Sequence, residues 1–307
     1  MISDLQTESA LSQPRFRFLI IDGHAYAYRA FYAIRHLNSP TGAPTNAIYG
    51  FVKMLAKMRS RIQPTHLVVI WDGGLAAERM EALPAYKAQR PPVPPDLDAQ
   101  IEDIHTFLRA SRIPSLHRDG VEADDWIAAL AKQAAATGAE VVIASSDKDF
   151  MQLVSERIGI LNPNDKSETI WNRDQVVTKT GVTPEQLVDW LSLIGDAVDN
   201  IPGIAGVGPK TATDLLRQFG SIDLMLERLA EIKSDKLRQA LTEGARLLRR
   251  NQTLIRLNET VASDVSFQQC CAQPADGGLL SELYARWGFK GLLRELTEVP
   301  APEEVLL

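Results

Sequence analysis

Three aspartates follow three apolar runs of the sequence, and this placement suggests a metal site. Asp22 ends the run RFRFLIID, Asp72 follows THLVVIW, and Asp147 follows AEVVIASS. Ligands of open parallel sheets bind at the carboxyl ends of the strands, so three strand-end aspartates would lie along one rim. Aspartate is also common in turns after strands, which explains one such residue more readily than three.

Six further carboxylates stand in short acidic blocks. The block VEADDW places three acids within four residues at the start of a predicted helix. Favourable interaction with a helix N-terminus accounts for one or two acids there, but not for three. The six further acids are Glu122, Asp124, Asp125, Asp149, Asp196 and Asp199.

Together these nine carboxylates predict a site for hard cations. In one cleft they would repel one another and raise their own pKa values unless cations neutralised them. The ligands are all oxygen, with no clustered His or Cys, which favours Mg²⁺ or Mn²⁺ over zinc. The EF-hand loop pattern is absent, which disfavours calcium storage. Two Mg²⁺ ions in such a cleft would suit hydrolysis of a phosphodiester bond.

Basic residues accompany the acids in the stretch AYKAQRPP. It contains Tyr86, Lys87 and Arg90, and Arg79 lies a little upstream. Lys87 and Arg90 are one helical turn apart and could face one way. They could hold a scissile phosphate or clamp a nucleic-acid backbone. A solvated, charged surface helix is the alternative interpretation.

A second basic candidate lies just after Asp22, in the stretch AYAYRAFYAI with Tyr28, Arg29 and Tyr32. Aromatic residues in this pattern belong to a core more often than to a base-stacking platform. Because Arg29 is so close to the acidic rim in the sequence, it is the better candidate for a phosphate contact.

The stretch IPGIAGVGPKT resembles a nucleotide-binding loop but lacks its spacing. A P-loop needs a strand before it and a glycine directly before its lysine. Here Pro209 separates Gly208 from Lys210, and the preceding QLVDWLSLIGD is helical. Proline suits the first helical position, and the exposed amides of such a turn can hold a phosphate. A plain turn between two helices is the alternative. The residues of the predicted contact are Gly203, Gly206, Gly208, Lys210 and Thr211.

The elements that must position these residues alternate between strand and helix up to about residue 182. This alternation predicts an α/β domain with a mostly parallel sheet. From Thr183 onward the chain is almost wholly helical, which predicts a helical subdomain packed on the sheet. We place the boundaries at 16–182 and 183–297, with a flexible tail at 1–15 and a second tail at 298–307.

The composition of the 307 residues, 45% hydrophobic and 23% charged, is typical of a soluble globular protein. No apolar run approaches the about 20 residues of a membrane span, and the N-terminus lacks a signal-peptide layout. Adjacent Cys270 and Cys271 disfavour a disulfide, so a reducing cytoplasm fits best. The net charge of −6 disfavours a nucleic-acid partner only weakly, because leaving out the nine acids changes it to +3.

These blocks, in this order, resemble the 5′–3′ exonuclease domain of bacterial DNA polymerase I, within the flap endonuclease family. The likeness extends from about Phe16 to about Leu296. It rests on LIIDGHAYAYRAFYA, PTNAIYGF, WDGG, YKAQRPPVPPDL, VEADDWIAALA, SSDKDFMQL and GDAVDNIPGIAGVGPKTATDLL. Two positions depart from the family pattern: Trp71 and Gly73 flank Asp72 where Phe and Ala are usual, and Lys148 stands where arginine is common. The chain carries no polymerase domain and is interpreted as a stand-alone member or a piece of a longer protein.

The resemblance implies a PIN-like nuclease fold with a helical arch at about 76–95. It also implies a helix–turn–helix of the helix-hairpin-helix type that holds duplex DNA, with a potassium ion at the turn from Gly203 to Gly208. All nine acids would serve two Mg²⁺ ions, broadly the first five at one ion and the last four at the other, with Mn²⁺ as a substitute. Lys87, Arg90 and Arg29 correspond to catalytic basic residues of the family. Arg79 and Tyr86 would contact DNA from the arch.

We therefore predict a monomeric, cytoplasmic, structure-specific 5′ nuclease of a bacterium, acting as 5′–3′ exonuclease and flap endonuclease. Its substrates would be 5′ flaps, nicked or branched duplexes and RNA primers on DNA, and it would be functionally linked to a separate DNA polymerase. Two alternatives come from other classes: a junction-binding protein with weak catalysis, and a metal-dependent phosphohydrolase of small nucleotides. The intact acid set argues against the first, and the predicted duplex contact argues against the second.

Overall fold

A six-stranded sheet forms the centre of the molecule in this computed structural model, which describes residues 16–165, 167–261 and 265–298. The strand order is β3-β2-β1-β4-β5-β6, and neighbouring strands are parallel except β5 and β6. The predicted mostly parallel sheet is confirmed. The strands are β1 (Arg17–Asp22), β2 (His66–Ile70), β3 (Ser115–Leu116), β4 (Glu140–Ala144), β5 (Ile158–Leu161) and β6 (Ile170–Trp171).

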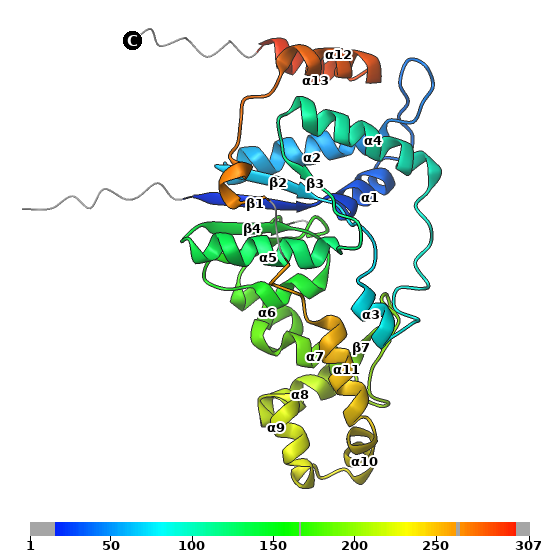
Figure 1. Cartoon of the computed structure of the whole chain (residues 1–307), viewed down its shortest axis with the longest axis vertical. Helices are drawn as coiled ribbons and strands as arrows, with labels where there is room; N and C mark the ends of the chain where they lie inside the picture. The colour runs from blue at the N-terminus through cyan, green and yellow to red at the C-terminus, as the bar shows by residue number, and fades with distance from the viewer. Residues whose placement is uncertain (1–15, 166, 262–264, 299–307) are drawn as a thin grey trace, which may run out of the picture.

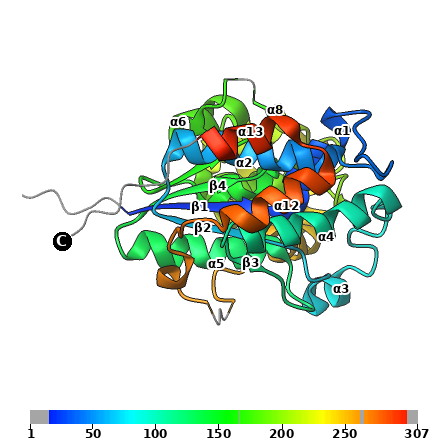
Figure 2. The ribbon, with the colours of Figure 1, turned by 90° about the horizontal axis from the view of Figure 1, so that it is seen from above.

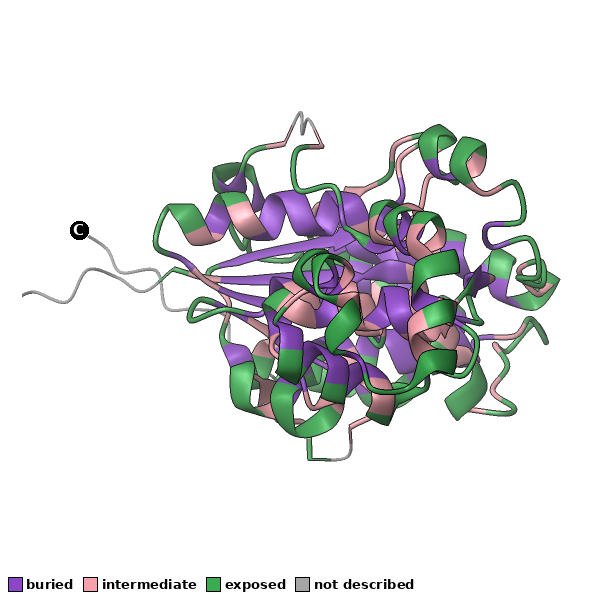
Figure 3. Ribbon diagram, turned by 90° about the horizontal axis from the view of Figure 1, so that it is seen from below, coloured by how far each residue is buried: buried purple, intermediate pink, exposed green. Residues whose placement is uncertain are grey.

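Side chains of the central strands alternate between two apolar layers, one on each face of the sheet. In β1, Phe18 and Ile20 belong to one layer, while Leu19 and Ile21 belong to the other. Figure 3 shows the strands as a buried sheet enclosed by helices whose outer turns are exposed. Because both faces are covered, these strands are continuously apolar in the sequence.

Helices cover both faces of the sheet (Figures 1 and 2). On one face lie α1 (Gly23–Ala33), α2 (Asn46–Ile62) and α4 (Pro95–Ala110). On the other lie α5 (Ala123–Ala136) and α6 (Arg173–Thr180). A 3-10 helix, η1 (Lys148–Leu153), follows β4, and another, η4 (Phe267–Cys270), packs beside β2.

A helical region follows at the lower end of Figure 1 and shares its apolar core with the α5 face of the sheet. A two-stranded hairpin, β7 (Gly195–Asp196) and β8 (Ile201–Pro202), connects α7 to α8. The elements of this region are η2 (Pro184–Gln186), α7 (Leu187–Ile194), α8 (Pro209–Phe219), α9 (Ile222–Glu227), η3 (Leu229–Glu231), α10 (Asp235–Glu243) and α11 (Ala245–Ile255).

The predicted arch, about 76–95, is largely irregular. It contains one short helix, α3 (Ala77–Ala82), followed by turns over 84–89 and an extended proline-rich stretch that reaches α4. The prolines at 91, 92 and 94 account for the missing helix, since proline inside a helix removes a hydrogen bond and clashes with the preceding turn.

The last two helices depart from the predicted subdomain 183–297. They are α12 (Gly277–Trp287) and α13 (Lys290–Glu298), and they pack on α2 and α4, at the end of the molecule opposite α8 to α10 (Figure 1). Buried Trp287 and Phe289 join the layer on that face, and the ring of Phe289 lies 5.0 Å from that of Tyr49. A helical pattern predicts the helices but not the face on which they dock.

The predicted N-terminal tail 1–15 and residues 299–307 of the predicted C-terminal tail lie outside the described residues. Among the helices of the described part of the chain, none combines the length and the hydropathy that crossing a membrane requires.

Candidate metal centre and nucleic-acid interface

The carboxyl ends of β2, β1 and β4 lie side by side and bring together the three strand-end aspartates. Asp22 pairs with Ile70 across β1 and β2, and Ile21 pairs with Ala144 across β1 and β4. Asp22 also caps helix α1: its Oδ1 accepts a hydrogen bond from the Ala25 amide at 3.0 Å. Because β1 lies between β2 and β4, the C-terminal ends of these three strands form one continuous rim.

A cleft of about 390 Å³ opens at this rim. Most of the predicted acids line it, from the strand ends, from the start of α5 and from the β7–β8 hairpin. The acids lining the cleft are Asp22, Asp72, Asp124, Asp147, Asp196 and Asp199.

Burial, with repulsion from nearby carboxylates, raises the pKa values of four acids at the rim, Asp22, Asp124, Asp147 and Asp149. Burial raises the pKa of Asp22 to about 6, and the nearby carboxylates of Asp147 and Asp72 add to the rise. The pKa values of Asp124, Asp147 and Asp149 are also raised, first by burial and then by neighbouring carboxylates. Such a cleft favours either protons or cations.

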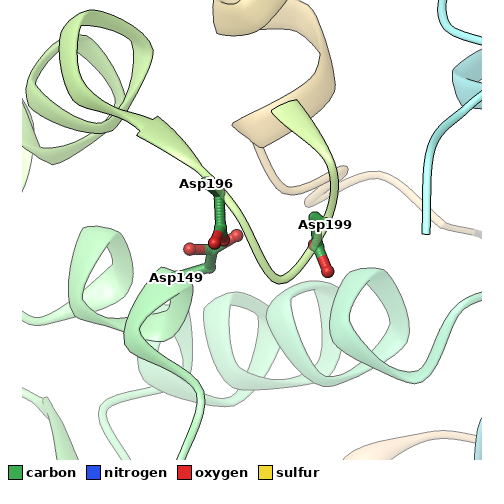
Figure 4. Close-up of side chains that lie close together, drawn as sticks. All are labelled: Asp149, Asp196 and Asp199. Carbon is green, nitrogen blue, oxygen red and sulfur yellow. The ribbon is translucent and has the colours of Figure 1, made fainter. Parts of the chain in front are cut away.

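Three carboxylates from η1 and the β7–β8 hairpin lie especially close to one another. Asp149, Asp196 and Asp199 each offer a carboxylate oxygen, and these oxygens lie within 4.8 Å of one another. Figure 4 shows the three side chains and the two segments that carry them, with Asp196 directly over Asp149 and Asp199 to one side. Asp149 Oδ1 is buried and has no hydrogen-bond partner. A buried acceptor without a donor is costly, so this oxygen and the all-carboxylate donor set fit a hard divalent cation.

Three basic side chains pair with acids at the site. Lys148 Nζ lies 3.0 Å from Asp196 Oδ1, and a guanidinium nitrogen of Arg90 lies 2.7 Å from Asp199 Oδ1. Lys87 Nζ lies 2.6 Å from Glu122 Oε2. These cations partly neutralise the carboxylates of the protein.

Lys87 is buried, and its backbone adopts a left-handed conformation with φ of 53°. Burial alone would lower its pKa, but the carboxylates of Asp124 and Glu122 outweigh this effect, and the pKa is raised. Likewise burial would raise the pKa of Glu122, but Lys87 and Arg79 hold it below its ordinary value. The pair is therefore ionised.

Five predicted site residues are buried beside the cleft and do not line it: Arg79, Tyr86, Lys87, Glu122 and Asp125. Asp125 accepts two hydrogen bonds from Arg79, and both side chains are buried. Tyr86 is also buried, with its hydroxyl 3.2 Å from Glu122 Oε2, so its ring is not a stacking surface. The structure groups Arg79, Tyr86 and Asp125 around the base of the arch, on the side of Glu122.

Arg29 lies beside the acidic cleft and not in it. It donates a hydrogen bond of 2.7 Å to Asn164 Oδ1 and lines a hollow of about 370 Å³ with Tyr28 and Tyr32. This hollow and the acidic cleft share Ala25, Tyr28 and Ser146 in their linings.

The glycine turn lies next to the acids, since β8 leads directly into it. A Cβ atom on Gly203 would lie 2.3 Å from the carbonyl carbon of Ile194, so only glycine fits there. Gly206 needs its positive φ of 80°, whereas Gly208 has open space around it. Lys210 is exposed in the first turn of α8, which has no side-chain cap. The first amides of α8 therefore lack an intrahelical acceptor and can meet an anion.

Sequence reasoning gave no role to three polar residues of the site. His24 and Lys148 line the cleft, and the Asp72 amide donates to His24 Nδ1 at 3.2 Å. Ser145 donates to Asp22 Oδ2 at 2.8 Å. Their signal in the sequence is proximity: each lies within two residues of a predicted metal ligand.

The chain matches two family models in succession. The model described as "5′-3′ exonuclease, N-terminal resolvase-like domain" covers residues 17–181. The model described as "5′-3′ exonuclease, C-terminal SAM fold" covers residues 182–277. Together they extend over the sheet domain and the helical region.

Curated relatives match almost the whole chain. The 5′-3′ exonuclease of Aquifex aeolicus is 36% identical over 280 residues, which is 91% of this chain and 95% of that protein. DNA polymerase I of Bacillus caldotenax is 37% identical over 290 residues, or 94% of this chain and 33% of the polymerase. The chain thus spans about a third of the length of such polymerase relatives, with 30% for that of Rhizobium leguminosarum.

Two solved structures share the fold. The T5 5′-exonuclease with bound zinc aligns with a TM-score of 0.66 at 23% identity, over 92% of this chain and 97% of that one. The catalytic core of Rad2 in complex with a DNA substrate aligns with a TM-score of 0.60 at 15% identity, over 92% of each chain.

Proposed function

This chain belongs to the 5′-3′ exonuclease family, and we propose that it is a structure-specific 5′ nuclease that hydrolyses phosphodiester bonds of branched or nicked DNA. One observation carries the proposal: two acids of the cleft and the glycine turn are parts of a single stretch of chain. Asp196 and Asp199 belong to the β7–β8 hairpin, and Gly203 follows β8 at once. A strand held by the turn is therefore close to the acids.

Duplex DNA would be held through its backbone. The first amides of α8, the Lys210 ammonium and the Thr211 hydroxyl would contact phosphates, and Gly206 and Gly208 would allow close approach. A potassium ion at the turn from Gly203 to Gly208 would add to this contact. Recognition would follow the shape of the junction, since backbone contacts carry no sequence information.

Divalent cations, Mg²⁺ or Mn²⁺ in its place, would be held by two groups of acids. Asp22, Asp72, Asp124 and Asp147 form the first, and Asp149, Asp196 and Asp199 form the second. When bound, such cations activate water and stabilise the charge that develops on the phosphate and the leaving oxygen.

The basic side chains would hold the scissile phosphate. Arg90 lines the cleft and would exchange its contact with Asp199 for a phosphate oxygen. Lys87 stands next to Glu122 and Asp124, at the edge of the same group of acids. Arg29 would contact the adjoining phosphate from the neighbouring hollow.

A flap-cleavage assay tests the proposal. The protein is incubated with a 5′-labelled flap duplex, a nicked duplex, an RNA–DNA hybrid and a mononucleotide, each with Mg²⁺ or with chelator. We expect Mg²⁺-dependent cleavage near the junction, and we expect unlabelled flap DNA to inhibit cleavage of the labelled flap by competition. Binding without cleavage contradicts the nuclease, and hydrolysis of mononucleotides alone contradicts the role of the duplex.

The role that follows is removal of flaps and RNA primers in the cytoplasm of a bacterium, next to a separate DNA polymerase. The chain would act as a monomer, because the acids, the basic side chains and the turn all come from one copy.

A further inference from the structure

We propose that Arg79 and Asp125 are a positioning pair that couples the duplex-binding helices to the metal-binding acids, and that Asp125 is not itself a metal ligand. This inference rests on the proposed function, which it deepens. It assigns both residues a role other than the metal and DNA contacts predicted for them from the sequence.

Both carboxylate oxygens of Asp125 already accept hydrogen bonds from protein donors. Two guanidinium nitrogens of Arg79 donate to the two carboxylate oxygens of Asp125, each at 2.8 Å. The backbone N–H of Asn258 donates a third hydrogen bond, to Asp125 Oδ1, also at 2.8 Å. Both side chains are only 8% exposed. Bidentate arginine–carboxylate pairs are strong and fix orientation.

A metal ion at Asp125 would have to replace these donors. Arg79 would then be left as a buried cation deprived of its main partner, which is unfavourable. The neighbouring Asp124 differs, because its side chain is 22% exposed and lines the acidic cleft. The two aspartates follow one another on α5, so their side chains diverge by about 100° around the helix axis.

Arg79 also joins three parts of the molecule. It lies on α3, at the base of the arch, and it donates to the carbonyls of Leu254 at 3.0 Å and Arg256 at 3.1 Å. These carbonyls belong to the C-terminal end of α11. Arg79 Nη1, which also donates to Asp125, lies 3.3 Å from Glu122 Oε1. The guanidinium therefore connects the arch, the acidic start of α5 and the helical region.

The other contacts of α11 lead to the glycine turn and to the second group of acids. Fully buried Asn251 donates to the carbonyl of Pro202, directly before Gly203, at 2.7 Å. Gln152 donates to the carbonyl of Ile255 at 3.1 Å and to that of Asp149 at 2.9 Å. Near its middle, helix α11 thus contacts the residue before the glycine turn, and at its end it contacts Gln152 of η1 and Arg79 of α3.

The first test compares Asp125→Asn with Asp124→Asn by Mn²⁺ binding, measured by electron paramagnetic resonance on the full chain without DNA. We expect Asp125→Asn to keep the Mn²⁺ midpoint within about twofold, and Asp124→Asn to weaken Mn²⁺ binding by about tenfold or more. Equal weakening in both variants would overturn the proposal. This measurement needs no nuclease activity, so it remains decisive even where the proposed function fails.

The second test uses Arg79→Lys, which keeps the charge but loses the bidentate contact, with the exposed Arg286→Lys as the matched control. We expect kcat on the 5′ flap to fall by about tenfold or more, because small displacements of positioned groups are costly. KM for flap DNA and the Mn²⁺ midpoint should stay within about twofold. A rise in KM with unchanged kcat would instead identify Arg79 as a DNA contact and overturn the proposal.

Unfolding of Asp125→Asn would not end the test, because the double variant Arg79→Leu/Asp125→Leu removes both charges together. With positioning lost and all cleft acids intact, it should bind Mn²⁺ as the wild type does. Loss of Mn²⁺ binding in this folded double variant would overturn the assignment.

Discussion

The ammonium group of Lys87 lies 2.6 Å from Glu122 Oε2, in the interior of the protein and not in the open part of the acidic cleft. Lys87 belongs to the turn between α3 and α4, and Glu122 directly precedes α5. The Tyr86 hydroxyl and the Ala76 amide bind the same carboxylate. Glu122 therefore binds the arch segment at two places, Ala76 and the pair Tyr86–Lys87, and so attaches it to the domain that carries the acids.

Replacing Lys87 by methionine should destabilise the protein. Loss of one partner of a buried ion pair costs about 3–5 kcal/mol when no other partner remains; here Arg79, Tyr86 and Ala76 still contact Glu122, so we expect about 2 kcal/mol. Urea unfolding of Lys87→Met beside the exposed control Lys290→Met measures the difference. Equal unfolding free energies in the two variants would mean that the contact with Glu122 contributes little.

Asp147→Asn should separate cleavage from binding. Its carboxylate lines the cleft, and loss of a cation ligand removes several kcal/mol of charge stabilisation in the transition state. Cleavage of a 5′ flap should therefore fall by more than about 100-fold, while the Kd for the flap stays near that of the wild type. Asp119→Asn, at a fully exposed side chain, is the control. Near-full activity of Asp147→Asn in Mg²⁺ would refute the metal assignment.

Without divalent cations, the protein should become less stable as the pH rises from about 4 to about 6. The pKa of Asp22 is about 6 in the folded chain and 3.8 as the ordinary value, so the folded state binds more protons than the unfolded state between these values. The stability from this proton is present below pH 4 and is lost as the pH passes 6. Thermal unfolding in chelator should show a smaller decline for Asp22→Asn than for the wild type.

Added Mg²⁺ should reverse this trend in the wild type, because the cation replaces the protons on the cleft acids. We expect the rise in Tm on adding Mg²⁺ to be larger at pH 8 than at pH 5. A rise that is equal at both values would argue against binding to these carboxylates.

Gly203→Ala and Gly208→Ala should fail in different ways. At Gly203 a Cβ atom would overlap the Ile194 carbonyl group, so the hairpin must shift and the protein should be destabilised. At Gly208 a Cβ atom meets nothing within 4 Å, so the unfolding free energy should change by no more than about 1 kcal/mol. We nevertheless expect Gly208→Ala to weaken flap binding, because the methyl group would stand between the backbone and the duplex. Unimpaired binding in both variants would place the duplex elsewhere.

Lys210→Ala should weaken binding of flap DNA and make it less dependent on salt. Each phosphate contact releases counterions, so the slope of log K against log salt should fall by about 1. Exposed Lys290, at the start of α13 at the opposite end of the molecule, provides the control Lys290→Ala. An unchanged slope would remove Lys210 from the interface.

The rim of the cleft was predictable because it depends on local rules. Apolar runs identify β1, β2 and β4, and parallel pairing brings their carboxyl ends together, so Asp22, Asp72 and Asp147 line one cleft. The glycine turn was equally readable, since Pro209 begins α8 and Gly206 takes the positive φ of a tight turn.

Contacts between distant segments were not predictable from spacing. Asp124 and Asp125 are neighbours in the sequence, and only the docking of α3 and of residue 258 against α5 decides which one faces the cleft. Nor does the sequence indicate that α12 and α13 return to the sheet domain, because their apolar positions fit either surface.

Helix α11 would set the distance between the duplex-binding turn and the acidic cleft of the proposed nuclease. Asn251 fixes the chain before the glycine turn and Ile255 receives the segment of Asp149; these two residues are one helical turn apart, about 6 Å along the axis. In the proposed nuclease, the place where the duplex binds and the place where a strand is cut would therefore be kept at a constant separation by backbone geometry. The nuclease would therefore cut at a fixed distance from the junction, independently of the base sequence of the DNA.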